Sequence, residues 1–330
     1  ELAARGHRVT VALLSYAGLG SEESVQAGVR WTSDDAFAGA TYLRRIRECM
    51  DDSRPDWVVG ASDTWFGILA ARSARHAGTR CAVDAYDNFE SYLPWALPLH
   101  WAWRRAVREA SLVTAAGPQL AERLGAGHRR VEVLPMTADP AFQAMDRERC
   151  RHELGLPQDE RLVGVVGSLD ERRGARHLLA AMERVRERGI RATLVVTGRS
   201  AARWARHAGV RALGALDDRQ VPVALNALDV ACVPAADNAF GRFSYPAKLC
   251  EALACGVPVV ASDTAPIRWM LGGDHPGLAP PGDPLAIADA IAAALASPRA
   301  QRIALPAWSA VAERYERLLL AASSSSNSAA

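Results

Sequence analysis

The sequence predicts an α/β fold of two Rossmann-like domains in series that face each other across a cleft. The chain has 330 residues, and at roughly 150 residues per domain this length corresponds to about two domains. In both halves, short apolar runs alternate with longer segments of helical spacing. Such alternation is typical of a parallel sheet covered by helices on both faces.

The first half supplies five expected strands and two expected helices. The strands are short apolar runs, and one helix has apolar residues at helical spacing and ends before Gly78, a stop signal. The strands are 8–14, 56–60, 80–85, 112–116 and 131–134, and the helices are 64–77 and the Trp- and Arg-rich segment 100–110.

The second half repeats the pattern more clearly. Its helices are amphipathic or rich in alanine, and two of them end at Gly189 and Gly256, as helices commonly do. The expected strands are 162–167, 192–198, 210–214, 229–234 and 257–262, and the expected helices are 175–188, 221–227, 246–255 and 284–297.

The N-terminus is unusual for a doubly wound domain. The chain opens on Glu1, in what looks like the last turn of a helix that leads directly into a strand. The first strand of a doubly wound sheet lies centrally, and its loop faces the ligand. We therefore expect a longer protein whose first strand, loop and most of whose first helix are missing here.

Composition excludes several classes of protein. Hydrophobic residues make up 49% and charged residues 23% of the chain, which excludes an intrinsically disordered or fibrous protein. The 39 basic and 37 acidic residues nearly balance, so we expect no nucleic-acid partner. No apolar run approaches the ~20 residues of a membrane span, and no signal peptide is visible. Six scattered cysteines without metal-ligand spacing favour reduced thiols, a cytoplasmic location and no bound metal.

The segment Phe243–Ser262 carries the strongest functional pattern. Pro246 marks a helix start, so the free backbone N–H groups around Ser244 to Ala247 (Pro246 itself has none) point outward at a positive helix terminus, where a phosphate can bind. Lys248, the only lysine in the chain, and Glu251 share one face of that helix. They suit a diphosphate and a ribose. The alternative is an ordinary i,i+3 ion pair that contributes roughly 0.3 kcal/mol.

This segment resembles the nucleotide-sugar motif of the retaining family 4 (group 1) glycosyltransferases, which have the GT-B architecture. Their pattern P-x-K-x-x-E-x-x-A-x-G-x-P-V-V matches Pro246 through Val260. The resemblance implies that Ser244, Tyr245 and Pro246 hold the donor diphosphate by their backbone. It also implies that Glu251 binds the ribose.

A second segment, 166–174, resembles the G-x-L-x-x-x-K-G turn of the same family. Gly167 and Ser168 would line the donor site, and Arg173 takes the lysine position, with Arg172 as the alternative. Either guanidinium could neutralise the leaving diphosphate. Ser168 stands where relatives often carry a further arginine.

Weaker similarity extends the resemblance along the chain, through 131–139, 229–234 and 308–314. It implies an acceptor-side domain over 1–142, a nucleotide-sugar domain over 143–306 and a helix 307–322 that crosses back to the first domain. The low-complexity, serine-rich segment 323–330 is expected to be a disordered tail.

The catalytic groups are expected at the end of the strand 80–85. Asp87 and Glu90 resemble a Y-D-x-H-E or Y-D-x-x-D stretch of some relatives, with Phe89 in place of the histidine. The pair could orient an acceptor hydroxyl, or Asp87 could cap the following helix. The catalytic candidates are Asp87, Glu90, Arg173 and Lys248.

The sugar side of the donor site departs from some relatives. The residue eight before Glu251 is Phe243, where relatives with an E-x7-E motif carry a glutamate. The preceding loop 237–241, including Phe240 and Gly241, is the expected replacement for its sugar contacts.

The function these residues predict is transfer of a sugar, with retention, from a nucleotide-diphosphate sugar to a hydroxyl acceptor without metal or cofactor. The acceptor is a glycan, a lipid-linked molecule or a small molecule. A nucleotide-sugar epimerase and a catalytically silent binding module are the alternatives. Trp95, Trp101 and Trp103 interleave with arginines over 95–108 and suit a membrane surface, unless the tryptophans pack into the core.

Overall fold

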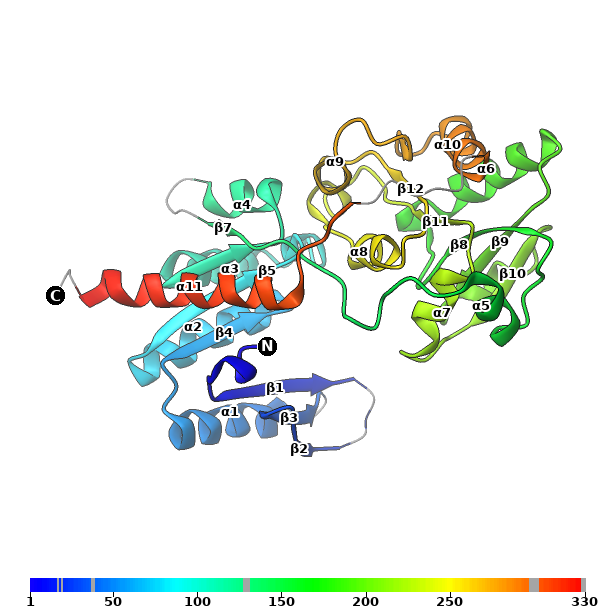
Figure 1. Ribbon diagram of the computed structural model, residues 1–330. Helices are drawn as coiled ribbons and strands as arrows, with labels where there is room; N and C mark the ends of the chain where they lie inside the picture. Colours follow the sequence, from blue (N-terminus) through cyan, green and yellow to red (C-terminus); the bar gives the residue numbers. More distant parts are fainter. Residues whose placement is uncertain (17, 19, 37–38, 127–130, 297–302, 328–330) are drawn as a thin grey trace. The chain divides into compact units, whose positions relative to one another are not determined.

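The computed structural model describes residues 1–327 except 17, 19, 37–38, 127–130 and 297–302. The chain divides into two compact units. Unit 1 comprises the described residues of 1–116, 120–135 and 308–330, and unit 2 those of 117–119 and 136–307. Both are mixed α/β with parallel sheets (Figure 1), which confirms the predicted fold class.

Unit 1 begins with a short 3-10 helix, η1 (Ala3–Arg5), and a three-stranded sheet in the order β1-β3-β2. β1 (Val9–Ser15) pairs parallel to β3 (Val29–Asp35), and β2 (Glu22–Gln26) pairs antiparallel to β3. A two-residue turn joins β2 to β3. Its residues, Ala27 and Gly28, have φ of 48° and 76°, as in the turns that suit tight hairpins.

The sequence analysis missed β2, β3 and the helix that follows, α1 (Gly39–Ser53). All of β2 is exposed, and Tyr42 is the buried residue of α1. Because β2 is wholly exposed, it has no apolar face and shows no clear hydrophobic period. Helix α1 is amphipathic, so its period was present in the sequence and was overlooked. Tyr42 ties α1 down, since its hydroxyl donates to the Ala12 carbonyl at 3.2 Å and its ring meets Phe66 edge-on at 6.3 Å.

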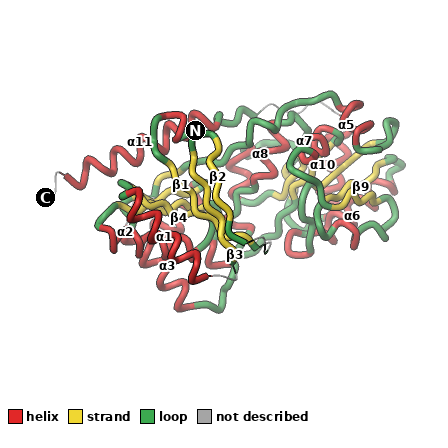
Figure 2. Tube along the Cα trace, turned by 90° about the horizontal axis from the view of Figure 1, so that it is seen from below, coloured by secondary structure: helices red, strands yellow, loops and turns green. Residues whose placement is uncertain are grey.

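The second sheet of unit 1 has four parallel strands in the order β4-β5-β6-β7. These strands are β4 (Trp57–Ala61), β5 (Arg80–Ala85), β6 (Leu112–Ala115) and β7 (Glu132–Val133); the associated helices are α2 (Thr64–Ala77), η2 (Phe89–Ser91), α3 (Leu97–Glu109) and α4 (Pro118–Gly125). Helix α2 lies beside α3 and also contacts α1 (Figure 2). Gly67 of α2 lets Trp103 of α3 approach closely, because a Cβ there would lie 2.3 Å from the ring.

The long C-terminal helix α11 (Trp308–Asn327) belongs to unit 1. Glu316 of α11 accepts hydrogen bonds from Arg5 at 2.5 Å and pairs with His7 at 2.7 Å. The expected disordered tail is wrong for 323–327, which are helical. The Ser323 hydroxyl donates to the Leu319 carbonyl one turn back, at 2.9 Å. Residues 328–330 of that expectation lie outside the described part.

Unit 2 contains a six-stranded parallel sheet in the order β10-β9-β8-β11-β12-β13. Numbered from β8, this order is 3-2-1-4-5-6, the doubly wound order with a switch point between β8 and β11. The strands are β8 (Arg161–Val165), β9 (Ala192–Thr197), β10 (Val210–Gly214), β11 (Val230–Val233), β12 (Val259–Ser262) and β13 (Leu278–Ala279).

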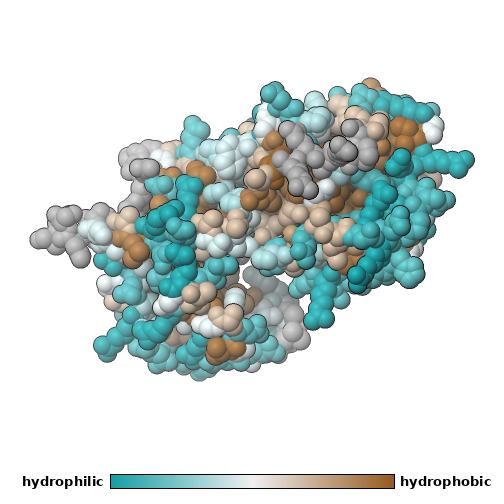
Figure 3. Space-filling model, viewed as in Figure 1, coloured by the Kyte–Doolittle hydropathy of each residue, from teal (hydrophilic) through white to brown (hydrophobic). Residues whose placement is uncertain are grey.

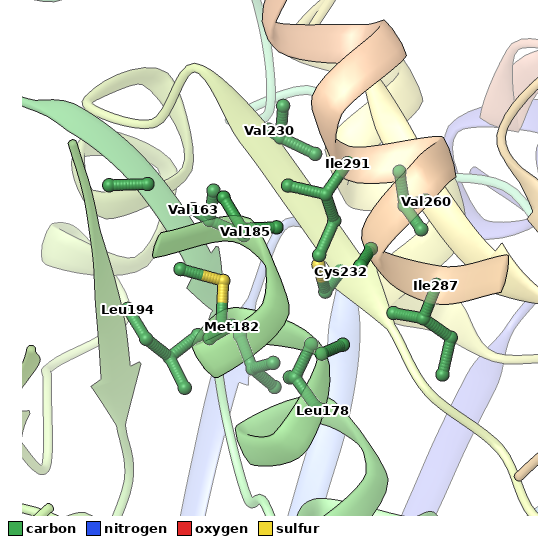
Figure 4. Packing of buried hydrophobic residues seen from close by; sticks show 14 of the residues in the cluster. Val163, Leu178, Met182, Val185, Leu194, Val230, Cys232, Val260, Ile287 and Ile291 are labelled. Atoms are coloured by element: carbon green, nitrogen blue, oxygen red, sulfur yellow. The ribbon is translucent and has the colours of Figure 1, made fainter. Parts of the chain in front are cut away.

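Helices cover both faces of this sheet. On one face, α6 (Ala175–Glu187) and α10 (Pro284–Ala296) bury Met182, Ile287 and Ile291 against the strands (Figure 4). A second cluster on the other face contains residues of the remaining helices. These helices are α5 (Arg147–Glu153), α7 (Gln220–Asn226), α8 (Ala247–Ala254) and α9 (Ala265–Leu271). Strands buried on both faces explain the near-continuous apolar runs of the sequence.

A buried arginine fastens α5 to the amino ends of β8 and β11. Arg151, 2% exposed, donates to Asp229 at 2.7 Å and to four backbone carbonyls. Asp229 also accepts from Arg147 at 2.5 Å and from the Leu162 N–H at 2.7 Å. This satisfied network lies at the sheet edge opposite the carboxyl ends of the strands.

The visible surface mixes hydrophilic and hydrophobic residues in both units (Figure 3). Among the described residues, none of the helices has the length and apolar character needed to cross a membrane.

Candidate functional site

The candidate site lies at the carboxyl edge of the unit 2 sheet, at the switch point between β8 and β11. The loop that follows β8, residues 166–174, and the segment that leads from β11 into α8 both start from this edge. Open α/β sheets bind ligands at such a point, because loops diverge there and leave a crevice. Most of the sequence-predicted donor residues are on these two segments.

Helix α8 supplies a positive helix terminus to the site. Pro246 is its N-cap, with φ −71° and ψ 118°, and the helix begins at Ala247, one residue later than expected. The Leu249 N–H bonds back to the Pro246 carbonyl at 2.9 Å. The N–H groups of Ala247 and Lys248 belong to the first turn, where helix geometry provides no intrahelical acceptor. The terminus therefore favours an anion.

Lys248 lies against the loop after β8. Its Nζ is 3.4 Å from the Ser168 carbonyl, and a Cβ on Gly167 would lie 2.3 Å from Nζ. Gly167 also has φ of 102°, which L side chains rarely adopt. Glycine is thus required at position 167 for two reasons: the backbone has a positive φ, and the Lys248 ammonium group occupies the space of a Cβ.

Burial, and after it the nearby positive charge of Arg173, lower the pKa of Lys248 to about 8, against the opposite effects of Glu251 and Asp170. Arg173 Nη1 also lies 3.4 Å from the Ser168 carbonyl. Two cations are thus held beside one carbonyl oxygen. Their mutual repulsion is relieved when an anion binds between them.

Glu251 lies one turn further along α8 than Lys248. Burial raises the pKa of its carboxyl group, and the charge of Lys248 only partly opposes that effect. A half-buried carboxylate beside the cationic end of the site can accept hydrogen bonds from two neighbouring hydroxyls. This geometry suits the sugar of a nucleotide.

Arg172 lies with Arg173 in the 3-10 turn η3 (Glu171–Arg173), which Asp170 caps by accepting from the Arg173 N–H at 3.0 Å. The Arg172 side chain lies outside the described part of the chain. Its choice as an alternative phosphate ligand stays a prediction.

The turn that follows β9 also contacts the site, and the sequence analysis missed it. Thr197 accepts the Gly167 N–H at 2.6 Å, and Ser200 and Trp204 both donate to the Leu169 carbonyl, at 3.2 and 3.1 Å. A signal for this turn was present in the sequence. The end of β9, Val-Val-Thr-Gly at 195–198, resembles the end of β8 and its loop, Val-Val-Gly at 165–167. Since the Gly167 N–H is already bonded, its contribution to the site is space for Lys248.

The loop before α8 is ordered by its own contacts. Asn238 accepts from the N–H groups of Phe240 and Gly241 at 3.0 and 2.9 Å, and Asp237 pairs with Arg242 at 2.6 Å. A Cβ on Gly241 would lie 2.1 Å from the Ala236 carbonyl. This loop therefore presents Phe240 and Gly241 in a defined conformation.

Tyr245 and Ser244, which precede α8, differ in the atoms that they can offer a ligand. The Tyr245 side chain is buried, where its hydroxyl bonds Gln119 and its ring meets Trp269 edge-on at 5.8 Å. A Cβ on Gly117 would overlap that ring. Tyr245 can thus offer a ligand only its backbone. Ser244 has extended backbone, φ −89° and ψ 129°.

Asp87 and Glu90 lie in unit 1, after β5. Asp87 accepts from the Tyr92 hydroxyl at 2.8 Å. Glu90 pairs with Arg104 at 2.6 Å and with Arg123 at 3.1 Å. Partial burial would raise the pKa of Glu90, but the hydrogen bond and charges of the two arginines outweigh it and hold that pKa below its ordinary value.

Phe89, which replaces a histidine of relatives, is 3% exposed. Its ring lies 5.3 Å from Tyr86, 5.8 Å from Tyr92 and 5.5 Å from Trp103. An aromatic cluster thus occupies a position where relatives carry an ionisable group. In the described parts of both units, no group of three His, Cys, Asp or Glu residues could hold a metal ion.

The sheet order and the cationic edge together place unit 2 in the doubly wound α/β class that binds ligands at a switch point. The comparison with known families is more specific. A model of glycosyl transferases group 1 matches residues 160–297, and a model of a glycosyl transferase 4-like domain matches 1–137. The chain belongs to the group 1, family 4 glycosyltransferases of GT-B type.

Curated relatives include two enzymes of actinobacteria. The chain is 28% identical over 212 residues to 2-deoxystreptamine glucosyltransferase of Streptomyces kanamyceticus, covering 60% of this chain and 54% of that protein. It is 34% identical over 170 residues to phosphatidyl-myo-inositol mannosyltransferase of Mycobacterium leprae, covering 49% and 44%. The chain thus spans about half the length of the curated relatives it matches.

Solved structures share the fold across nearly the whole chain. Sucrose-phosphate synthase of Thermosynechococcus elongatus matches with a TM-score of 0.73 and 18% identity, covering 97% of this chain and 86% of that one. HepE of Anabaena, in complex with UDP-glucose, matches with a TM-score of 0.67 and 17% identity, covering 92% and 87%.

Proposed function

We propose that this protein is a glycosyltransferase that moves a sugar from a nucleotide-diphosphate sugar to a hydroxyl acceptor. One observation carries the proposal. Lys248, at the positive end of α8, lies against Gly167 and beside Arg173 at the switch point of the sheet. Two cations and a helix terminus form a site for a diphosphate, and Glu251 is placed to accept from ribose hydroxyls.

In the proposed reaction, the bond between the anomeric carbon and the diphosphate oxygen breaks, and that oxygen leaves with the electron pair. Lys248 and Arg173 neutralise the charge that develops on the leaving diphosphate. The acceptor oxygen bonds the anomeric carbon, and its proton is taken up by the departing diphosphate. Because protein cations supply this charge, we propose that the reaction needs no metal ion. Membership of family 4 supports retention of configuration, and the relatives' names support a hexosyl group.

For the acceptor side, Asp87 remains the stronger candidate of the unit 1 pair. Glu90 is held ionised by two arginines, so it is poorly suited to accept and release protons at neutral pH. Asp87 accepts from the Tyr92 hydroxyl, a neutral donor, and it stands at the aspartate position of the Y-D-x-H-E stretch. We expect Asp87→Asn to lower transfer without weakening nucleotide affinity.

A silent nucleotide-sugar-binding module is the second candidate. The observations that favour it are the arginine-bound Glu90 and the aromatic side chains at 89 and 243 where relatives carry ionisable groups. Such a module would bind the donor through the same unit 2 residues and release no product.

Radiolabelled UDP-, GDP- and ADP-sugars separate these functions. Transfer to an added acceptor, or slow donor hydrolysis, supports the glycosyltransferase, and activity retained in EDTA supports metal independence. Binding without turnover supports the silent module, and interconversion of two sugars supports an epimerase. Lys248→Met should abolish the signal, whereas Glu187→Gln, which alters an exposed ion pair on α6, should not.

We also propose a peripheral contact with a lipid surface through residues 95–108. The structure divides the tryptophans of this segment, with Trp103 2% exposed in the core but Trp95, Leu97 and Trp101 exposed by 77%, 70% and 61%. The guanidinium of Arg105 lies 5.9 Å from the Trp101 ring. Exposed tryptophan beside arginine suits an interface with anionic lipid. We propose a cytoplasmic location as well, because the described cysteines are free thiols.

Vesicle sedimentation tests this contact. Vesicles containing anionic lipid should retain the protein, and Trp95→Ser with Trp101→Ser should release it. Trp65→Ser changes another exposed tryptophan, on α2, and should leave sedimentation unchanged. Equal sedimentation of all three proteins would contradict the contact.

A further inference from the structure

The last residue of β9 and the turn that follows it hold the loop after β8 at two points. At the first point, the buried Thr197 hydroxyl accepts the Gly167 N–H at 2.6 Å. At the second, Ser200 Oγ and Trp204 Nε1 donate to the Leu169 carbonyl at 3.2 and 3.1 Å. The two points bracket Ser168 in the chain.

These anchors leave little room for the loop to move. The Leu169 and Trp204 side chains are both buried in the same hydrophobic cluster. Two donors on one carbonyl fill both of its lone pairs. A Cβ on Gly198 would lie 3.2 Å from the Gly167 carbonyl carbon, so the two turns are packed backbone to backbone.

The fixed part of the loop is the part that faces both cations. The Ser168 carbonyl lies 3.4 Å from Lys248 Nζ and 3.4 Å from Arg173 Nη1. Any displacement of Leu169 or Gly167 moves that carbonyl and changes the spacing of the two cations. The spacing of the cations in turn decides how well they match two phosphate groups.

We propose that Thr197, Ser200 and Trp204 are positioning residues for the nucleotide diphosphate: they hold the loop 167–173 in the geometry that lets Lys248 and Arg173 act together, without touching the ligand themselves. The proposal rests on the proposed function, because it assigns these residues to the same donor site. It extends that site to a third strand, β9, through side chains that the sequence motifs do not include.

A purely structural role for Trp204 is the alternative, and chosen substitutions separate the two. Trp204→Phe keeps an aromatic ring in the core but removes the indole N–H, and Ser200→Ala removes the second donor. The matched control is Thr193→Val on the same strand. Thr193 donates to Glu160 at 2.6 Å from the amino-terminal half of β9, so its loss removes a hydrogen bond far from the loop.

The test is a titration of the full chain with UDP and with GDP, with the Tm of every variant measured alongside. The double variant Ser200→Ala/Trp204→Phe should bind nucleotide about tenfold more weakly, because it loses two hydrogen bonds that hold the loop. Thr193→Val should lower Tm and leave affinity unchanged. The milder Ser200→Ala variant should weaken binding about threefold, which keeps the test decisive if the double variant does not fold.

A second readout follows the pH dependence of affinity. Burial against Gly167 and the charge of Arg173 hold the pKa of Lys248 at about 8, so a displaced loop should move the midpoint of the pH profile upward. A variant that only loses stability should keep the midpoint of the unaltered chain.

The outcomes distinguish the two proposals. If the unaltered chain binds neither nucleotide, the proposed function fails and the positioning role falls with it. If the unaltered chain binds and the double variant binds equally well, with an unchanged pH midpoint, the positioning role alone is overturned.

Discussion

The titration of Lys248 gives the sharpest prediction. Burial and the neighbouring Arg173 lower the pKa of Lys248 to about 8, so the free protein loses this cation within an accessible pH range. A diphosphate binds the protonated form, and binding raises the Lys248 pKa. Nucleotide affinity should therefore be level below pH 8 and weaken as pH rises through 8.

The magnitude follows from the competent fraction of the protein. The apparent Kd equals the intrinsic Kd divided by the fraction with Lys248 protonated, which is about 0.9 at pH 7 and about 0.1 at pH 9. Affinity should thus fall about tenfold between these values. Each binding event at pH 9 should take up about 0.9 proton. Titration of the nucleotide contributes little to this pH dependence, because its terminal phosphate has a second pKa of about 6 and is already ionised above pH 7.

Calorimetry in two buffers of different ionisation enthalpy measures both quantities. The Lys248→Arg variant is the control, since a guanidinium stays protonated throughout and its affinity should stay level from pH 7 to 9. Cys250, on the same helix, has its pKa raised by burial to about 12 and does not titrate in this range. Unchanged affinity of the unaltered chain from pH 7 to 9, or an inflection that persists in Lys248→Arg, would refute the reasoning.

Three further outcomes are expected. Gly167→Ala should abolish nucleotide binding by displacing Lys248, whereas Gly189→Ala, with φ of 77° and open space, should cost only about 1 kcal/mol of stability. Asp229→Asn leaves the buried Arg151 without its charged partner and should lower the free energy of unfolding by about 3 kcal/mol. The control Arg147→Ala removes an exposed partner and should lower it by less than about 1 kcal/mol, both measured by denaturant unfolding. In equilibrium binding, Glu251→Gln should weaken UDP or GDP binding at least about tenfold with an unchanged Tm, and equal affinity would reject its ribose role.

Much of the unit 2 fold could be predicted from the sequence, because its strands are buried on both faces. Val163, Val165 and Leu194 belong to continuous apolar runs, and such runs show a strand without knowledge of its neighbours. In unit 1, β2 is wholly exposed and pairs through a tight turn at Ala27. The sequence analysis missed it, because an exposed strand carries no apolar period.

The candidate site divides in the same way. Pro246, Lys248 and Glu251 were found because a helix start and a shared helix face are local properties of the sequence. The burial of the Tyr245 side chain could not be predicted, because it depends on contacts with Gln119 and Trp269, which are remote in the chain. The ion pairs of Glu90 with Arg104 and Arg123 likewise join three separate elements.

By itself the sequence determined the alternation of strands and helices, the family and the helix that begins near Pro246, since each depends on residues close together in the chain. The tertiary structure alone decided that Lys248 is desolvated against Gly167, that Trp204 and Ser200 donate to the Leu169 carbonyl, and that two arginines pair with the ionised Glu90. Desolvation and charge pairing arise from atoms brought together by the sheet order, and neighbours along the chain do not encode them.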